Sequence, residues 1–279
     1  MTAIRHHFTV DVEEYFQVSA FEGSVSRSSW DAYPPRAAPC VGEILQLLGR
    51  RGEHGTFFIL GWMAERAPDL VKEIHRAGHE VASHGWDHKR VTMQTPDEFR
   101  VSVRRTKQLL EALTGTAVRG FRAPSFSIVP GYEWALDVLI EEGHEYDSSF
   151  FPVRRPGGYG YPGAPRHRHR IERPAGAITE FPMTTLRRLG VSLPASGGAY
   201  FRIFPYAVIH AAFAECERDG VSGMFYVHPW ELDPAQPRIA APWLSRVRHY
   251  TGLKRTAPRL NRLFDDFRFT SIADTLASQ

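Results

Sequence analysis

The chain has only two cysteines and no long run of apolar residues. Cys40 and Cys216 stand far apart in unrelated contexts, which excludes a disulfide framework and a cysteine-based zinc site. A membrane-spanning helix needs about 18 consecutive apolar residues, and no segment approaches that length. The first residues, MTAIRHHFTVDVEEYF, also lack the apolar stretch of a secretory signal. We therefore expect no transmembrane segment and a cytoplasmic location, near the cytoplasmic face of the membrane if the substrate is lipid-linked.

The excess of basic over acidic residues is also small. The 34 basic and 31 acidic residues leave a net charge of +3, too small an excess to indicate a nucleic-acid partner. A hydrophobic content of 43% over 279 residues is enough for a sizeable core. The aromatic content of 12% suits a sugar-binding cleft, although ordinary core packing explains it equally well.

Segments typical of strands and helices alternate along the chain. Strands are expected at 6–13, 54–60, 79–84, 117–124, 144–149, 178–183 and 222–230. Helices are expected at 38–52, 68–78, 95–115, 131–143 and 205–220. This alternation predicts an α/β fold, a distorted (β/α)7-type barrel spanning residues 1–240. Residues 150–174 read as a long, substrate-facing loop, and 241–279 as a helical extension packed on the barrel.

Chemically able side chains fall at one end of these strands. Each of five strands ends in such residues: Asp11 and Glu13, His84 with His88, Arg122, Asp147, and His228. In a parallel α/β barrel the carboxyl ends of the strands converge on one face, where catalytic residues lie. This shared position predicts one composite site.

The spacing of these residues suggests a metal centre. Asp11 and Glu13 are two apart and point to the same side of a strand, whereas Glu14 points away unless the strand has already ended. His84 and His88 share a face if the chain turns helical after its strand. Two imidazoles and one carboxylate make a metal site with open positions, and the second carboxylate is then free to act as a base. Taken singly, each feature also has a structural explanation, such as a solvated acidic pair.

The segments TVDVEE, SHGWDH, FRAP, YDSS and YVHP resemble, in order, the five motifs of the polysaccharide deacetylases, the NodB-homology group of carbohydrate esterases. SHGWDH is the most specific match. The N-terminal segment and the C-terminal extension resemble the subgroup associated with exopolysaccharide loci. The chain departs from the usual motifs in having Val12 in place of a second aspartate, Ser125 in place of an aromatic residue, and Phe150 or Phe151 in place of tryptophan.

The resemblance implies a metal-dependent hydrolase acting on an N-acetylated glycan. It implies zinc, with cobalt, nickel or manganese as alternatives, on Glu13, His84 and His88, with Glu14 the competing third ligand. Catalytic residues would be Asp11 as base, Arg122 orienting it, and His228 as acid, held by Asp147. Ser125, Phe126, Tyr146 and Trp230 would contact the substrate or the oxyanion. Two alternatives remain: a hydrolase of small cyclic amides or ureides, and a carbohydrate-binding protein with a degenerate site.

Overall fold

Seven strands form a curved parallel sheet in the computed structural model, which describes residues 4–154 and 160–278. Their order is β10-β1-β2-β3-β4-β5-β7, with β6 added antiparallel to β7 and β11 pairing parallel to β1. The strands are β1 (His6–Val12), β2 (Thr56–Ile59), β3 (Glu80–Ser83), β4 (Gly120–Phe121), β5 (Tyr146–Asp147), β6 (His169–Arg173), β7 (Gly176–Glu180), β8 (Thr185–Arg188), β9 (Val191–Pro194), β10 (Met224–Val227) and β11 (Phe269–Thr270).

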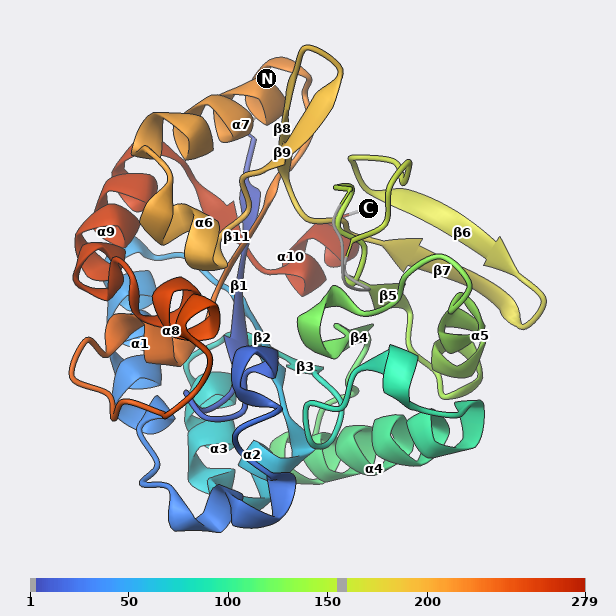
Figure 1. Ribbon diagram of the computed structural model, residues 1–279. Helices are drawn as coiled ribbons and strands as arrows, with labels where there is room; N and C mark the ends of the chain where they lie inside the picture. The colour runs from blue at the N-terminus through green and yellow to red at the C-terminus, as the bar shows by residue number, and fades with distance from the viewer. Residues whose placement is uncertain (1–3, 155–159, 279) are drawn as a thin grey trace.

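Helices surround these strands on the outside (Figure 1). The α-helices are α1 (Ala37–Arg51), α2 (Gly61–Arg66), α3 (Pro68–Arg76), α4 (Pro96–Thr114), α5 (Trp134–Glu141), α6 (Gly198–Ile203), α7 (Tyr206–Arg218), α8 (Trp243–Tyr250), α9 (Thr256–Asp266) and α10 (Ile272–Ala277). Short 3₁₀ helices are η1 (Ser19–Phe21), η2 (Arg27–Ala32), η3 (Val91–Met93), η4 (Pro124–Phe126), η5 (Pro229–Leu232) and η6 (Leu253–Arg255).

The alternation of side chains along β1 separates the core from the site. Phe8, Val10 and Val12 are fully buried and pack in one apolar cluster with residues of α1, α7 and α9. Thr9 and Asp11 point to the opposite side, as the two-residue period of a strand requires. The same strand therefore anchors the outer helices and supplies polar groups to the barrel interior.

The barrel is distorted where β7 and β10 would meet. The base of the β8–β9 hairpin fills this position, because the Ala195 N–H donates to Thr184 O and the Tyr226 N–H donates to Ser196 O, at 3.2 and 2.7 Å. Gly197 approaches so closely that a Cβ there would lie 1.8 Å from Tyr226 O. Only glycine fits this crossing. The predicted distorted (β/α)7 barrel is confirmed.

Two expectations about the connections need correction. The segment 150–174 is not one loop, because its described part contains β6, which hydrogen-bonds to β7 along its length; residues 155–159 lie outside the described residues. The extension 241–279 is not only helical, because β11 pairs with β1 between α9 and α10. Period-2 signals in such short strands are too brief to identify from sequence. Within the described residues no helix has the length and apolar character needed to cross a membrane.

Candidate active site

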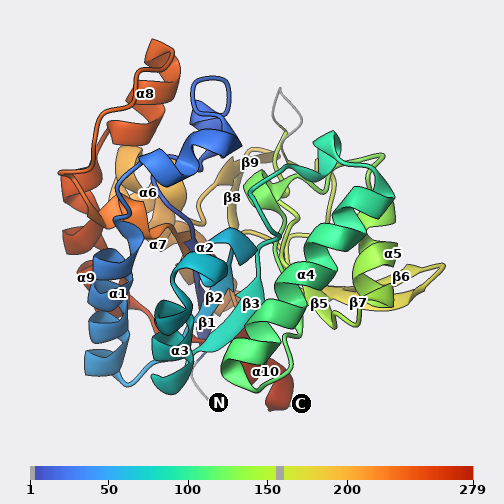
Figure 2. The same ribbon diagram turned by 90° about the horizontal axis from the view of Figure 1, so that it is seen from below.

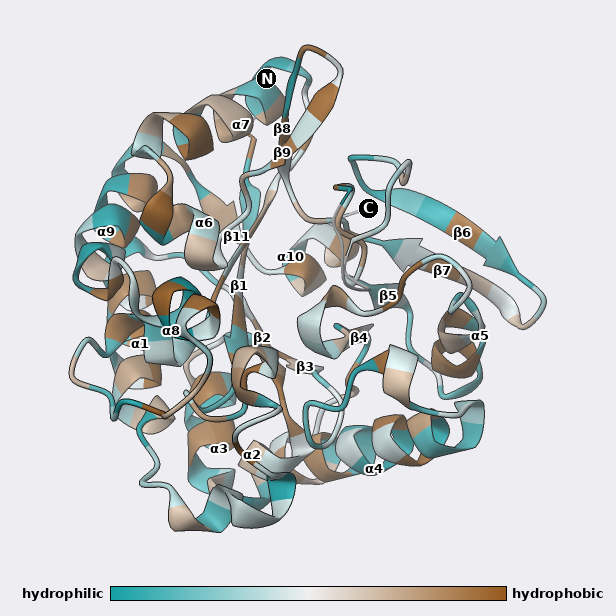
Figure 3. Cartoon of the chain, in the orientation of Figure 1, coloured by the Kyte–Doolittle hydropathy of each residue, from teal (hydrophilic) through white to brown (hydrophobic). Residues whose placement is uncertain are grey.

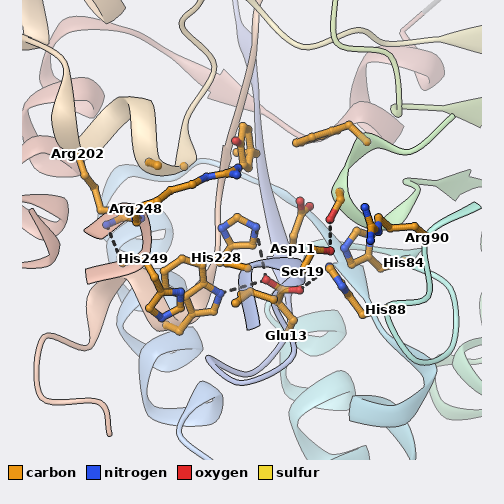
Figure 4. A pocket seen from close by; sticks show the side chains of 18 residues that line it. Asp11, Glu13, Ser19, His84, His88, Arg90, Arg202, His228, Arg248 and His249 are labelled. Carbon is orange, nitrogen blue, oxygen red and sulfur yellow. Dashed lines mark hydrogen bonds and ion pairs between the residues drawn. The ribbon is translucent and has the colours of Figure 1, made fainter. Parts of the chain in front are cut away.

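A cavity of about 280 Å³ opens at the carboxyl ends of the parallel strands (Figure 4). We call it the central cavity. Its lining residues come from β1 and the segment that follows it, from the turns after β3 and β4, from β10 and the turn after it, and from α6 and α8: Asp11, Glu13, Val18, Ser19, Ala20, His84, His88, Arg90, Ser125, Phe126, Gly198, Ala199, Arg202, Tyr226, His228, Trp230, Arg248 and His249. Of the predicted site residues, only Tyr146, Asp147 and the buried Arg122 are not part of this lining.

Glu13, His84 and His88 lie together on the cavity floor. One potential ligand atom from each falls within 4.8 Å of the other two, and all three side chains are buried. His84 is oriented by its Nδ1, which lies 2.8 Å from the Arg122 carbonyl oxygen, so Nε2 is left with a lone pair. Glu13 Oε2 is buried and, within the described chain, accepts no well-directed hydrogen bond, although His88 Nε2 is 2.8 Å away.

The ionisation of these groups suits a divalent cation. Burial lowers the pKa of His84 to about 4, so its imidazole is neutral at pH 7. Burial alone would raise the pKa of Glu13, but His88 and His228 nearby lower it to about 2, so Glu13 is a carboxylate. One carboxylate and two imidazoles are the donor set of many catalytic zinc sites. These residues fit the predicted metal.

The turn from His84 to His88 is not the helix that the spacing suggested. Gly85 and His88 both have left-handed backbones, with φ values of 74° and 55°. This conformation is unfavourable for a residue with a side chain, and such strain concentrates at functional sites. The two imidazoles are therefore brought to one ion position by a tight turn, which their four-residue spacing does not encode.

Glu14 serves a different purpose from Glu13. Its carboxylate accepts hydrogen bonds from the backbone N–H groups of Arg36 and Ala37, at 2.9 and 3.0 Å. These are free N–H groups at the start of α1, where a negative charge is favourable. The choice between Glu13 and Glu14 is thus explained: one faces the cavity and the other binds the helix terminus.

Arg122 holds Asp11 beside the candidate metal ligands. Arg122 is fully buried and its Nη1 lies 2.6 Å from Asp11 Oδ1 and 2.7 Å from Thr9 Oγ1. Its remaining N–H groups donate to the carbonyl and hydroxyl oxygens of Ser148, at 3.1 and 2.9 Å. Every contact fixes the guanidinium plane, so the ion pair orients Asp11 rigidly.

His228 lines the same cavity as Asp11, but its partner is not the one that we predicted. His228 Nδ1 is 2.7 Å from Glu231 Oε1, and its Nε2 is 3.6 Å from Glu13 Oε1. Glu231 in turn pairs with the buried Arg202, whose Nε is 2.5 Å from Oε2. Burial alone would lower the pKa of His228, but Glu13 and Glu231 raise it overall. Glu231 and Arg202 were missed, although a glutamate three residues after His228, in HPWE, was a usable signal.

Asp147 is directed away from His228, which corrects the prediction that it holds the acid. Asp147 accepts a 2.6 Å hydrogen bond from Ser149 Oγ, and its carboxyl group is hydrogen-bonded to that of Glu180. Both side chains are fully buried. Burial raises the pKa of Asp147 to about 6 and that of Glu180 well above its usual value. Asp147 and Glu180 therefore form a buried pair between the neighbouring strands β5 and β7, and burial favours a proton on this pair. Its distance from the cavity follows from the outward phase of Asp147 on β5.

Tyr146 also lies outside the cavity, contrary to the substrate-binding prediction. Its ring belongs to the apolar cluster inside the barrel, and its hydroxyl donates to Glu80 Oε1 at 2.7 Å. Glu80 begins β3, so the hydroxyl is at the opposite end of the barrel from the site. Tyr146, which precedes the motif residue Asp147, is therefore a core residue.

Trp230, Ser125 and Phe126 do line the cavity. Trp230 donates from Nε1 to Glu13 Oε1 at 3.1 Å and is stacked between His228 and His249, with ring centroids 5.0 and 4.1 Å apart. Ser125 and Phe126 both have left-handed backbones, and Ser125 Oγ is 2.6 Å from Ser19 Oγ. His249 was not predicted because its contact with Trp230 spans nineteen residues and depends on where α8 packs.

The cavity thus combines a group of residues that could hold a metal ion with a buried carboxylate, Asp11, and a histidine, His228, an arrangement suited to hydrolysis. A family model described as polysaccharide deacetylase matches residues 23–133, and one described as a domain of unknown function (DUF3473) matches residues 148–277. The match over residues 23–133 confirms the resemblance to the polysaccharide deacetylase family that the motifs indicated.

Characterised relatives align over parts of the chain. A peptidoglycan-N-acetylglucosamine deacetylase of Bacillus cereus is 32% identical over 34% of this chain and 35% of its own length. One of Listeria monocytogenes is 26% identical over 53% and 33%. A chitooligosaccharide deacetylase of Rhizobium leguminosarum bv. trifolii is 31% identical over 36% and 44%. The matched region thus spans under half of each relative's length.

Solved structures share the fold. A crystal structure of a provisionally assigned polysaccharide deacetylase from Mycobacterium smegmatis superposes with a TM-score of 0.62 and 18% identity, over 99% of this chain and 90% of the other. A CE4 family pseudoenzyme from Bacillus anthracis superposes with a TM-score of 0.51 and 14% identity, over 98% and 65%. At these identities the likeness concerns the fold.

Proposed function

We propose that the protein removes N-acetyl groups from the amino sugars of a polysaccharide or its oligosaccharide precursor, in a pathway of exopolysaccharide synthesis. The observation that carries this proposal is that Asp11, fixed by Arg122, lines one cavity together with Glu13, His84, His88 and His228. The relatives named as peptidoglycan and chitooligosaccharide deacetylases support the same chemistry.

Glu13, His84 and His88 would hold the divalent cation, for which we propose zinc. A cation held there supplies a water of lowered pKa and polarises the acetamide carbonyl. Asp11 takes a proton from the attacking water, and Arg122 keeps Asp11 ionised through their ion pair. The donor that this geometry offers to the developing oxyanion, besides the cation, is the backbone N–H near Ser125.

His228 acts on the leaving nitrogen. Glu231 holds Nδ1, so Nε2 faces the cavity and carries the proton that the amine receives. The bond between the acetyl carbon and the sugar nitrogen breaks, the water oxygen joins the acetyl carbon, and the products are acetate and a free amino sugar. Trp230 and Phe126 offer apolar faces on which a sugar ring can pack.

The test is acetate release from a panel of N-acetylated oligosaccharides, with and without a chelator. We expect release that the chelator abolishes and that zinc restores. Asp11→Asn should lower turnover by about 10²- to 10⁴-fold while bound metal is retained, because an amide cannot accept the proton. Asp69→Asn, at a side chain that is 96% exposed on α3, is the matched control.

Two results would contradict the proposal. Normal deacetylation by Asp11→Asn would show that Asp11 is not the base. Hydrolysis of a cyclic amide or ureide, with no acetate released from any N-acetylated sugar, would favour the alternative hydrolase.

A further inference from the structure

Helix α8 stands beside the mouth of the central cavity and exposes apolar side chains to solvent. Trp243, Leu244 and Val247 are 69%, 64% and 49% exposed. They lie at i, i+1 and i+4 and so occupy one contiguous arc of the helix, which we call the α8 face. In Figure 2, α8 projects from the end of the molecule opposite to the N-terminus, the end toward which the parallel strands run.

The α8 face is surrounded by unpaired positive charge. From Pro234 to Phe264 the sequence has seven arginines and lysines and no aspartate or glutamate. The rest of the chain therefore carries 27 basic against 31 acidic residues, a net charge of the opposite sign. Within the described residues Arg238, Arg246 and Arg248 form no ion pair, and all three are exposed. Figure 3 shows hydrophobic and hydrophilic residues side by side on α8.

The helix is fixed in place by contacts behind the α8 face. Buried Arg202 donates to the carbonyl oxygens of His249 and Thr251, at 2.9 and 2.6 Å. The Tyr250 hydroxyl accepts from the Ile239 N–H at 2.8 Å, which ties the preceding segment to the helix. The apolar residues are therefore held outward by the fold, and cannot turn inward without breaking these contacts.

We propose that the α8 face docks on an anionic membrane surface and so places the mouth of the central cavity at the level of the lipid headgroups. An exposed tryptophan with aliphatic neighbours and flanking arginines is the composition of helices that lie in a membrane interface. Charge complementarity selects anionic lipids, since each basic residue near the surface adds attraction. An acidic polymer in solution would match the arginines but leaves the exposed Trp243, Leu244 and Val247 unexplained.

Membrane docking rests on the proposed function for its substrate, an N-acetylated glycan, and adds that this glycan would be carried at a membrane. His249 connects the two sites, because it belongs to α8, stacks on Trp230 and lines the cavity. A glycan attached to a lipid would then reach the cavity from the surface on which α8 rests.

The experiment is co-sedimentation of the whole chain with vesicles of phosphatidylcholine and phosphatidylglycerol at 3:1, compared with vesicles of phosphatidylcholine alone. We expect binding to the anionic vesicles, at least tenfold weaker binding to the neutral ones, and weakening by salt. Trp243→Ser with Leu244→Ser should reduce binding at least tenfold. Arg246→Gln should reduce it about fivefold, the effect of one cation near the surface.

Val101→Ser is the matched control, because Val101 is 66% exposed on α4, away from the cavity. Val101→Ser should bind vesicles as the unaltered chain does. All variants should have the thermal unfolding midpoint of the unaltered chain. Equal binding by the Trp243 variant and the unaltered chain would overturn the proposal. Formation of a dimer would also overturn it, if the unaltered chain dimerises with rising concentration, the Trp243 variant does not, and neither binds vesicles. A second copy of the chain would then cover the α8 face. Vesicle binding without acetate release would instead contradict only the proposed function.

Discussion

Replacing Glu231 by glutamine separates the role of His228 from that of the metal ligands. Glu231 is fully buried, and its carboxylate meets His228 Nδ1 at 2.7 Å and Arg202 Nε at 2.5 Å. Burial alone would raise the pKa of Glu231, but Arg202 and His228 lower it to about 2, so the group is an anion throughout the working range. Glu231→Gln keeps the shape of the side chain and removes the charge.

The expected size follows from these contacts. A hydrogen bond to a charged group contributes about 2 kcal/mol, so the imidazolium of His228 loses about that much stabilisation and the pKa of His228 falls. Since His228 must be protonated to donate, activity should be lost at a lower pH on the alkaline side of the profile. Turnover at the optimum should fall about 30-fold. The free energy of unfolding should drop by about 3 kcal/mol, because Arg202 is left buried without its carboxylate.

The assay is the pH dependence of turnover, with bound metal and thermal unfolding measured on the same samples. Glu215→Gln is the matched control, because it breaks an ion pair with Arg166, 2.6 Å apart, on α7 away from the cavity. That variant should lose stability and keep the pH profile. If Glu231→Gln behaves in the same way, with an unmoved alkaline limb, then Glu231 only supports the fold and the reasoning fails.

Two further predictions concern metal binding and pH. His84→Ala should lose bound zinc in equilibrium dialysis, whereas His79→Ala, at the other end of the same strand, should retain it; retention by both would remove His84 from the ligand set. Because the folded-state pKa of Asp147 is raised from 3.8 to about 6, the protein should lose up to about 3 kcal/mol of stability as pH rises through this window. Asp147→Asn should flatten that decline in urea unfolding at pH 4.5 and 7, and an unchanged slope would contradict the buried proton.

Much of the barrel and of the candidate site could be predicted, because the sequence indicates where the strands end. The β1 pattern, with Phe8 and Val10 outward and Asp11 inward, follows from a two-residue period and sets the direction of the whole site. The convergence of β1, β3, β4 and β10 at one end then follows from parallel topology. The strand pattern alone was sufficient to place Asp11, Glu13 and His84 at one end of the barrel.

The parts that could not be predicted depend on geometry that a period does not encode. Strand β5 has only two residues, so the phase that sends Asp147 outward and Tyr146 inward could not be established from alternation. The turn after β3 has a left-handed His88, which no spacing rule anticipates. Arg202 reaches His249 across 47 residues of sequence, and such a contact exists only once α6 and α8 are packed.

The site draws on both matched regions and on Asp11 and Glu13, which precede them, and its parts should respond separately to mutation. His84, His88 and Arg122 lie in residues 23–133, whereas His228 and Glu231 lie in residues 148–277. β1 pairs with β2 on one side and β10 on the other, so it joins the halves, and the Trp230 N–H donates to Glu13 directly after β1. A change on the α8 side should therefore alter the acid and, through Trp230, the carboxylate of Glu13, while His84 and His88 keep their geometry. A change in the turn after β3 should do the reverse.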